Sequence, residues 1–228
     1  MRERPRLLDL YCKAGGASMG YHLAGFEVIG VDHEPQKNYP FEFVQADAIE
    51  FIKAHGHEFD AVHASPPCQR YSTAAAKARK RGRSYPDLIA PTREALRATG
   101  LPYVMENVEA AARELLDPLR LCGSSFGLDV RRHRLFETAG FAWSPPPCDH
   151  GWQTPRFRSL NSDKRRRGDL ACVVGVHGKL NYAGEFEVRR RAMGIDWMTN
   201  AELTQAIPPA YTRHVGEALM EHLRAVAA

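Results

Sequence analysis

A cysteine that follows two prolines is the residue of this sequence best placed for covalent chemistry. The stretch 59–64 is predicted to form a short strand, and Pro66 and Pro67 end it, because proline can continue neither a strand ladder nor a helix. Cys68 is therefore expected at the carboxyl end of a strand, the edge at which open α/β sheets bind their ligands. A thiol in a stiff turn at that edge can act as a nucleophile, whereas an isolated cysteine is ordinarily a packing residue.

Other polar side chains stand at the ends of further predicted strands. The expected strands are 7–11, 26–31, 41–45 and 101–105, and the side chains at or just beyond their ends are Tyr11, Asp32, Asp47 and Glu106. Helices are expected from the glycines at 15–16 to Ala24 and at 48–55, 86–99, 109–116, 185–193, 201–207 and 211–227, with a mobile loop at 69–84. In the first half, strands and helices alternate, which predicts an α/β fold with a doubly wound sheet and one active edge.

Gly15 and Gly16 follow the first predicted strand, at the point where a helix should begin. Glycine lets the backbone N–H groups at a helix start approach a ligand closely. Asp32, at the tip of the second strand, stands where such folds hold a nucleotide ribose. Glycines after a strand are a weak signal alone, but together with Asp32 they indicate a cofactor that contains a nucleoside.

Charge and composition narrow the class of protein. Basic residues gather at 77–83, 156–167 and 189–191 in a chain of net charge +4, the footprint of a nucleic-acid partner, although one such cluster alone could be a solvated face. The 228 residues fit one domain, or one domain with a small appendage. Five widely spread cysteines favour a reduced, intracellular protein, and no apolar run suggests a membrane span or secretory signal.

Five blocks of residues occur in a characteristic order: Asp9-Leu10-Tyr11-Cys12 with Gly15-Gly16, Ser65-Pro66-Pro67-Cys68-Gln69, Glu106-Asn107-Val108, Arg132-His133-Arg134, and Gln205-Ala206-Ile207-Pro208-Pro209-Ala210-Tyr211. In this order they resemble the DNA (cytosine-5) methyltransferase family in its compact phage and bacterial form. The resemblance implies a Rossmann-like S-adenosylmethionine-dependent methyltransferase sheet with a small, loop-rich target-recognition region. The implied parts are a catalytic and cofactor-binding domain at 1–142, a target-recognition region at 143–187 and a segment at 188–228 that returns to the catalytic domain.

The resemblance also implies an activity, methyl transfer from S-adenosylmethionine to C5 of cytosine in double-stranded DNA after base flipping. Cys68 would add to C6 of the base as a thiolate, activated by a cationic neighbour such as Arg134. Glu106, protonated in a closed site, would stabilise charge at N3, and Asn107 would orient the loop. Arg134, with Arg132 behind it, would stabilise the adduct, and His133 would be positional.

Further roles are carried over from the same resemblance. The implied cofactor-binding residues are Asp9, Tyr11, Gly15, Gly16, Asp32, His33, Asp47, Pro66 and Leu88. The implied DNA-binding residues are Gln69, Ser72, Lys77, Arg79, Lys80, Arg81, Arg83, Arg165, Arg166 and Arg167. The protein is expected to be a cytoplasmic monomer in a bacterial or phage-infected cell, serving DNA methylation or restriction–modification.

Some positions depart from the family pattern and leave alternatives open. Lys13 stands where the family usually has glycine, Val130 where it usually has glutamine, and the region between Phe141 and Glu187 is short. A tRNA cytosine-5 methyltransferase on the same scaffold, or a DNA-binding module without turnover, are the competing interpretations. A zinc site is conceivable from Cys148, Asp149, His150, Cys172 and His177. Their spacing is irregular and the family requires no zinc, so we expect no metal.

Overall fold

A mixed sheet forms the centre of the molecule. The computed structural model describes residues 4–155, 171–176 and 184–227. Seven strands follow the order β3-β2-β1-β4-β5-β7-β6. Their bounds are β1 Arg6–Leu10, β2 Glu27–Asp32, β3 Glu42–Gln45, β4 Ala61–Ala64, β5 Tyr103–Asn107, β6 Leu119–Leu121 and β7 Arg134–Ala139. The first five strands in this order pair in parallel, whereas β7 runs antiparallel to β5 and β6. The strand numbers decrease from β3 to β1 and increase from β4 to β5, so the order of the strands reverses between β1 and β4.

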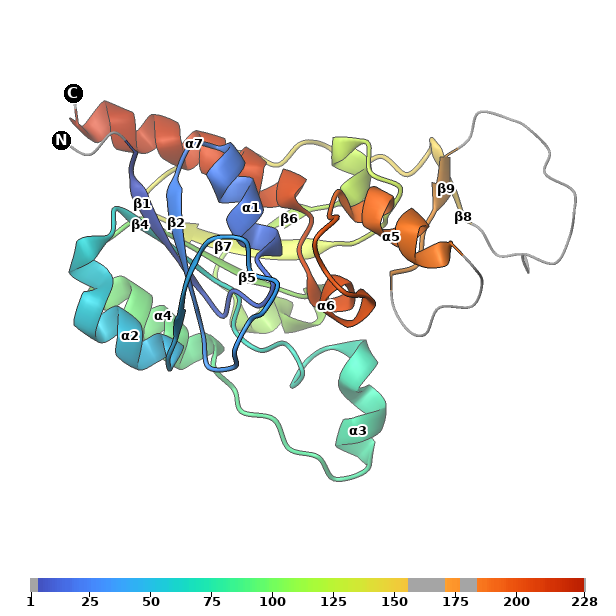
Figure 1. Cartoon of the computed structure of the whole chain (residues 1–228), viewed down its shortest axis with the longest axis horizontal. Helices are drawn as coiled ribbons and strands as arrows, with labels where there is room; N and C mark the ends of the chain where they lie inside the picture. Colours follow the sequence, from blue (N-terminus) through green and yellow to red (C-terminus); the bar gives the residue numbers. More distant parts are fainter. Residues whose placement is uncertain (1–3, 156–170, 177–183, 228) are drawn as a thin grey trace, which may run out of the picture.

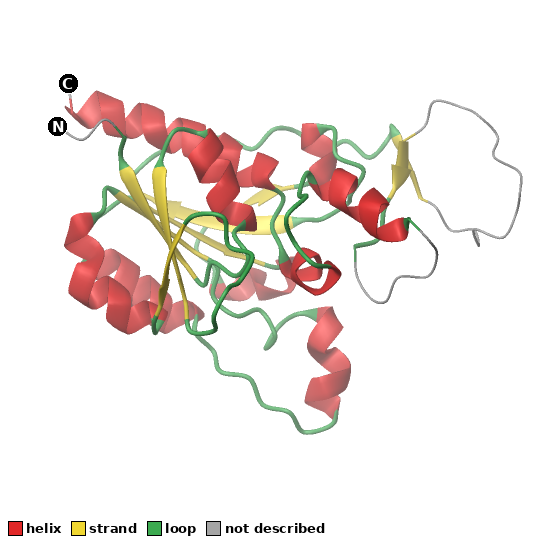
Figure 2. Ribbon diagram, in the orientation of Figure 1, coloured by secondary structure: helices red, strands yellow, loops and turns green. Residues whose placement is uncertain are grey.

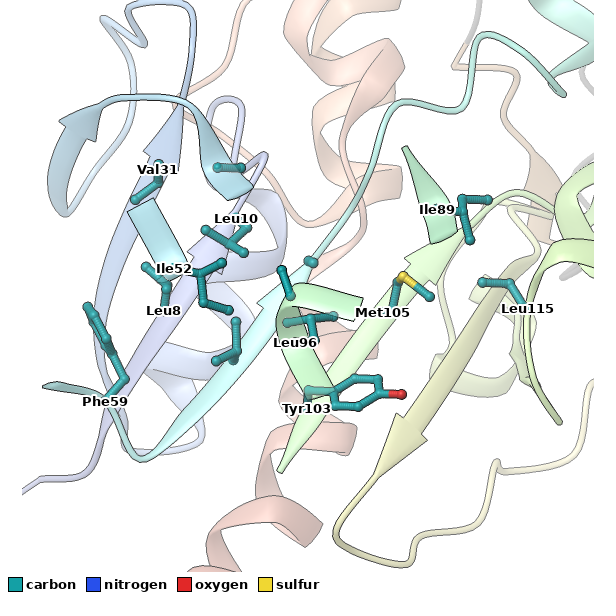
Figure 3. Packing of buried hydrophobic residues seen from close by; sticks show 14 of the residues in the cluster. Leu8, Leu10, Val31, Ile52, Phe59, Ile89, Leu96, Tyr103, Met105 and Leu115 are labelled. Carbon is teal, nitrogen blue, oxygen red and sulfur yellow. The ribbon is translucent and has the colours of Figure 1, made fainter. Parts of the chain in front are cut away.

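Helices cover both faces of this sheet (Figure 2). One face carries α1 (Gly16–Leu23) and α7 (Pro209–Ala227), and the other carries α2 (Ala48–His55) and α4 (Ile89–Ala98) (Figure 1). On the α2 and α4 side the core includes Leu8, Leu10, Ile52, Leu96 and Met105, which meet between helix and strand (Figure 3). A strand that is apolar on both faces requires cover on both faces, which explains this three-layer arrangement.

The remaining elements are shorter. They are α3 (Ala76–Lys80), α5 (Glu185–Met193), α6 (Asn200–Gln205), the parallel pair β8 (Gln153–Pro155) and β9 (Ala171–Val173), and single 3₁₀ turns at Gly56–Glu58, Thr73–Ala75, Glu109–Glu114 and Gly123–Phe126. Within the part of the chain that the structure describes, no helix combines the length and the apolarity needed to cross a bilayer. The α/β prediction is confirmed.

Two glycines set the distance between α1 and α7. A Cβ on Gly20 would lie 2.0 Å from Oγ1 of Thr212 and 2.3 Å from the backbone oxygen of Pro209. A Cβ on Gly16 would lie 2.5 Å from the backbone oxygen of Ile207. The segment that begins α7 therefore packs directly on the first turns of α1, beside the glycine turn.

Several predicted boundaries require correction. The stretch 69–84 was expected to be a loop, but it contains α3, which Figure 1 shows on an excursion away from the sheet. β5 extends through Asn107, because its pairing with β7 continues to the Asn107–Leu135 register. β6, β8 and β9 were not predicted, since three-residue strands leave too little alternation in the sequence. The helix expected at 109–116 is the 3₁₀ turn Glu109–Glu114.

Candidate active site

The turn that carries Cys68 is held at both ends by hydrogen bonds. After β4, the backbone N–H groups of Tyr71 and Ser72 donate to the backbone oxygen of Cys68 at 2.9 and 2.8 Å. On the other side, Nδ2 of Asn107 donates to the backbone oxygen of Pro66 at 2.9 Å. The nucleophile candidate is half-buried, and its backbone is fixed to both its own loop and the neighbouring strand.

Glu106 and Arg134 form an ion pair beside this turn. Nε of Arg134 lies 3.0 Å from Oε1 of Glu106, and both side chains are largely buried. They come from the antiparallel strands β5 and β7, where Glu106 pairs with Phe136 and Arg134 stands two residues before Phe136 in β7, so both side chains are on the same face of the sheet. Burial raises the pKa of Glu106, and Arg134 opposes that shift. The site thus favours a protonated carboxyl more than water does.

The pKa of Cys68 differs from the expectation that Arg134 activates this residue as a thiolate. Burial of the thiol and the nearby Glu106 carboxylate raise the pKa of Cys68, and the opposing effect of Arg134 does not overcome them. The cationic neighbour is therefore present, but on balance the free site holds the sulfur as a thiol. The two groups are linked, because protonation of Glu106 removes the charge that disfavours the thiolate.

Arg132 and Tyr211 join this edge of the sheet to the end of the chain. Nη2 of Arg132 donates to the backbone oxygen of Thr204 in α6 at 2.7 Å, and the hydroxyl of Tyr211 in α7 donates to the backbone oxygen of Arg132 at 2.6 Å. Arg132 is buried, and that burial lowers its pKa to about 9, which leaves the guanidinium charged at neutral pH. Arg132 is therefore built into the scaffold behind Arg134.

His63 is a site residue that sequence analysis did not identify. Its ring is fully buried in β4, where Nδ1 lies 2.9 Å from the hydroxyl of Tyr21 and Nε2 lies 2.9 Å from Oγ of Ser65. Burial lowers the pKa of His63 to about 3, so the imidazole is neutral. The sequence feature that could have identified His63 is a polar ring inside an apolar strand, two residues before Ser65. The hydrogen bond of His63 holds Ser65 at the start of the turn.

At the carboxyl end of β1 and β2, three predicted cofactor residues come together with Lys13. The buried Asp32 carboxylate accepts hydrogen bonds from the backbone N–H groups of Lys13 and Glu34 at 3.2 and 3.0 Å, and it pairs with Nζ of Lys13 at 3.3 Å. Nδ1 of the exposed His33 lies 3.2 Å from the same carboxylate. The Tyr11 hydroxyl shares a hydrogen bond of 2.8 Å with Thr92 in α4. Lys13 has a φ of 45°, a conformation that favours glycine, which the family usually has at this position. Lysine adopts the same backbone conformation here at a cost in strain.

Asp9 lies deeper, below the glycine turn. It is fully buried, it accepts a hydrogen bond from the Ser18 hydroxyl, and burial raises its pKa to about 7. Its Oδ1 atom has no hydrogen-bond partner among the described residues. Asp9 is thus joined through Ser18 to the first turn of α1.

The other predicted cofactor residues surround this edge. Gly15 is the N-cap of α1 with φ 80 and has no side chain to cap the helix, and the Asp9 carboxyl interacts with the backbone N–H of Ser18 in the first turn. Asp47 caps α2, its Oδ1 accepting from the N–H groups of Ile49 and Glu50. Leu88 precedes α4, and Pro66 is buried beside the Cys68 turn. These groups match the chemistry of S-adenosylmethionine, because a helix start with a glycine N-cap suits a carboxylate and the Asp32 and Asp47 carboxylates suit hydroxyl and amino donors.

Among the described residues, the basic side chains that were predicted to bind DNA divide into two groups. The side chains of Lys77, Lys80, Arg81 and Arg83 are exposed on or after α3. Arg79 instead points into the loop, where Nη1 donates to the backbone oxygens of Gln69 and Ser72 at 2.6 and 2.8 Å. Arg79 therefore connects α3 to the turn after Cys68. Arg165, Arg166 and Arg167 lie outside the described residues.

Comparison with protein families and known sequences gives an independent result. Residues 6–114 match the family model of the C-5 cytosine-specific DNA methylase. The Type II methyltransferase M.AquIA of Picosynechococcus sp. is 28% identical over 236 residues, covering 90% of this chain and 90% of that protein. The Type II methyltransferase M.FnuDI of Fusobacterium nucleatum is 30% identical over 76 residues, which cover 30% of this chain and 22% of that protein.

Solved structures share the fold. An E. coli protein encoded within a prophage and described as a DNA modification methyltransferase aligns with a TM-score of 0.62 at 16% identity, covering 96% of this chain and 99% of that one. The Dnmt2 methyltransferase of S. pombe aligns with a TM-score of 0.57 at 13% identity, covering 99% and 100%. At these identities the likeness concerns the fold, and it confirms the predicted methyltransferase type of sheet.

Proposed function

We propose that the chain is a member of the C-5 cytosine-specific DNA methylase family, whose model matches residues 6–114, and that it methylates C5 of cytosine in duplex DNA through a covalent Cys68 adduct. The family model and the relative M.AquIA support the resemblance seen in the sequence. The adduct, the flipped base and the individual roles below are our proposal.

One observation carries the proposal: the buried Glu106–Arg134 pair stands beside the turn that holds Cys68. Cytosine C5 is a poor nucleophile until a group adds at C6. Addition of a thiolate at C6 moves electron density toward N3, O2 and C5, so a nucleophile, an acid and a cation are needed together. Cys68 is the nucleophile, Glu106 is the acid and Arg134 is the cation.

Proton positions follow from the two raised pKa values. Two protonation states of the pair matter for the reaction: the Cys68 thiol beside a Glu106 carboxylate, and the Cys68 thiolate beside a neutral Glu106. The second state is reactive, because the thiolate attacks C6 while the Glu106 carboxyl donates to N3. Arg134 stabilises the charge that develops on the base. Once C5 carries the methyl group, loss of the C5 proton to a base re-forms the C5–C6 double bond and expels Cys68 as a thiolate, and N3 returns its proton to Glu106.

S-adenosylmethionine supplies an electrophilic methyl group when it is bound. Asp32 would accept hydrogen bonds from its ribose, the start of α1 after Gly15 would receive its carboxylate, and Asp47 would accept from its adenine amino group. Tyr11, His33, Leu88 and Pro66 would form apolar and aromatic walls of the same site.

The exposed cations of α3 support a role in holding DNA. Arg79 connects α3 to the segment that follows Cys68, so contact of α3 with phosphates would act on the nucleophile's own loop. A base inside a duplex must leave the stack to reach Cys68, and a cationic segment beside the opening can hold the displaced strand. The region 143–187 would read the target sequence.

Trapping on a mechanism-based substrate tests the proposal. Duplex DNA with 5-fluorocytosine should form a stable adduct with the protein and labelled S-adenosylmethionine, because fluorine at C5 cannot leave as a proton. Cys68→Ala should form none, and Cys12→Ala, which alters another cysteine, should form the adduct. Label transfer into normal duplex DNA without any trapped adduct would contradict the covalent mechanism. Label found only in tRNA would move the substrate to the competing class.

A further inference from the structure

Four side chains with metal-binding atoms converge outside the proposed active site. Sγ of Cys122, Sγ of Cys148 and one ring nitrogen each of His133 and His150 all lie within 4.8 Å of one another. They come from the end of β6, the start of β7 and the segment before β8. Both cysteines are free thiols in the structure. Two thiols and two imidazoles are the donor set of a Cys₂His₂ zinc site.

The distances suit a single central ion. Nε2 of His150 lies 3.3 Å from Sγ of Cys122 and 3.2 Å from Sγ of Cys148, and Nε2 of His133 lies 3.5 Å from Sγ of Cys148. With Zn–S near 2.3 Å and Zn–N near 2.0 Å, a tetrahedral site puts sulfur and nitrogen about 3.5 Å apart. One ring nitrogen has one proton or one lone pair, so direct hydrogen bonds cannot account for both contacts of His150 at once.

Groups around the four side chains orient them as in metal sites. Nδ1 of His133 lies 3.2 Å from Oε2 of Glu109, which leaves Nε2 facing the thiols. A carboxylate on the far nitrogen is the usual partner of a metal-bound histidine. Oγ of Ser124 lies 3.3 Å from Sγ of Cys122 and 3.6 Å from Sγ of Cys148. The hydroxyl of Ser124 donates to Sγ of Cys122 and would stabilise it as a thiolate.

The backbone also holds the cluster in place. The hydroxyl of Ser125 donates to the backbone oxygen of Pro147 at 2.9 Å, immediately before Cys148. Nη2 of Arg131 lies 3.3 Å from the backbone oxygen of His150. Asp149 is directed away from the cluster, since its Oδ1 accepts from the N–H of Gly151 at 2.7 Å. These contacts fix the ligand spacing independently of the region that the structure leaves undescribed.

We propose that Cys122, His133, Cys148 and His150 bind one structural Zn²⁺ that fastens the start of the 143–187 region to the catalytic sheet. Binding releases the two thiol protons and leaves no coordination position for a substrate, so the ion serves structure rather than catalysis. His133 lies between Arg132 and Arg134, so the same ion would hold the start of β7 in position. The proposal stands apart from the methyl-transfer mechanism.

This ligand set corrects the one considered from the sequence. Cys148 and His150 are members, but Asp149 is not, and Cys122 and His133 take the remaining places. The Cys172 side chain and His177 lie outside the described residues. The expectation that no metal binds is therefore replaced by this proposal.

Metal analysis of the full-length protein tests the site. After purification under reducing conditions, we expect about one zinc per chain by mass spectrometry of the metal. After the zinc is removed and cobalt added, we expect visible bands of tetrahedral Co²⁺ together with a thiolate-to-cobalt charge-transfer band. Absence of zinc and of both cobalt features would overturn the proposal.

Variants locate the metal. Cys148→Ser changes an exposed side chain, so its fold should survive, and it should lose the zinc and weaken the charge-transfer band. Cys68→Ser, which changes a cysteine outside the cluster, should keep both. Zinc retained at the same stoichiometry and affinity in Cys148→Ser would reject this ligand set. Loss of zinc from Cys68→Ser as well would mean that the ion is not held by these four residues.

Discussion

The side-chain amide of Asn107 donates a hydrogen bond of 2.9 Å to the backbone oxygen of Pro66, two residues before the proposed nucleophile. The Asn107 Oδ1 atom also accepts from the N–H of Val108 at 2.9 Å, which fixes the orientation of the amide. Prolines cannot donate backbone hydrogen bonds, so a turn rich in proline has few ways to attach itself to the sheet. Asn107 therefore provides a link between β5 and the Cys68 turn.

Asn107→Ala should slow methyl transfer without removing any reacting group. The Pro66 oxygen would lose its buried donor at a cost of about 1–3 kcal/mol, and the turn would hold Cys68 less firmly. We expect kcat to fall by about 10-fold to 100-fold while the Kd for S-adenosylmethionine changes little. Single-turnover methyl transfer and equilibrium cofactor binding measure the two effects. Asn38→Ala, which removes an amide contacting Glu202, is the matched control, and an unchanged kcat in Asn107→Ala would reject this role.

Alkylation of Cys68 should depend on its two charged neighbours. Because its pKa is raised, Cys68 in the free enzyme should react with iodoacetamide only at higher pH than an ordinary thiol. Glu106→Gln removes a negative charge and should shift the profile to lower pH, while Arg134→Ala should shift it to higher pH. Peptide mass spectrometry follows the single site. The same profile in all three proteins would show that these side chains do not control the thiol.

Asp9 should make the protein less stable as the pH rises from acid to neutral. Its pKa is about 7 in the folded protein and near 3.8 otherwise, so over this interval the unfolded chain loses a proton that the folded chain keeps. The contribution of Asp9 to the free energy of unfolding is fully present below a pH of about 3.8. It decreases as the pH rises and is lost above a pH of about 7, for a total on the order of 4 kcal/mol.

Asp9→Asn removes this titration, so the difference in unfolding free energy between the two proteins should change with pH over that interval. Urea unfolding at a series of pH values measures it. Asp196→Asn changes an exposed carboxyl and serves as control. A difference between Asp9→Asn and the parent that stays constant across the interval would contradict the raised pKa.

Gly20→Ala should weaken the contact of α1 with α7. The added methyl would overlap Oγ1 of Thr212 and the Pro209 backbone oxygen, so the helices must move apart. Overpacking of this kind costs about 1–3 kcal/mol. Gly175→Ala is a matched control, because a Cβ there would have no neighbour within 4 Å and its φ is not in the left-handed region. Equal thermal unfolding of the two variants would argue against a tight α1–α7 contact.

The cations of α3 should determine the salt dependence of DNA binding. Replacing Lys77, Lys80 and Arg81 by glutamine should reduce the slope of log Kd against log salt by about 2 to 3, if each contacts one phosphate. Lys53→Gln on α2 is the control, since that lysine already pairs with Glu50 at 2.9 Å on a different part of the surface. Fluorescence anisotropy at several salt concentrations gives the slopes. An unchanged slope in the triple variant would place the DNA elsewhere.

Much of the site could be predicted because its residues follow local rules. Each parallel strand ends at the same edge of the sheet, so Tyr11, Asp32, Cys68 and Glu106 could be assigned to one edge from the sequence alone. The glycine turn and the two prolines specify their own backbone geometry. For the helices at 48–55 and 185–193 the predicted bounds are those of the structure, since helix periodicity and capping are also local.

Other features depend on contacts between distant segments. The Arg134–Glu106 pair exists because β7 runs antiparallel beside β5, a pairing that no local pattern encodes. The raised pKa of Cys68 results from the burial and charges that this pairing creates. Cys122, His133, Cys148 and His150 have no regular spacing in the sequence, and only the folding of β6, β7 and the segment before β8 brings them together. The sequence by itself determined which groups are available and at which strand ends; the tertiary structure decided which of them meet, because contact and burial depend on the packing of segments far apart in the chain.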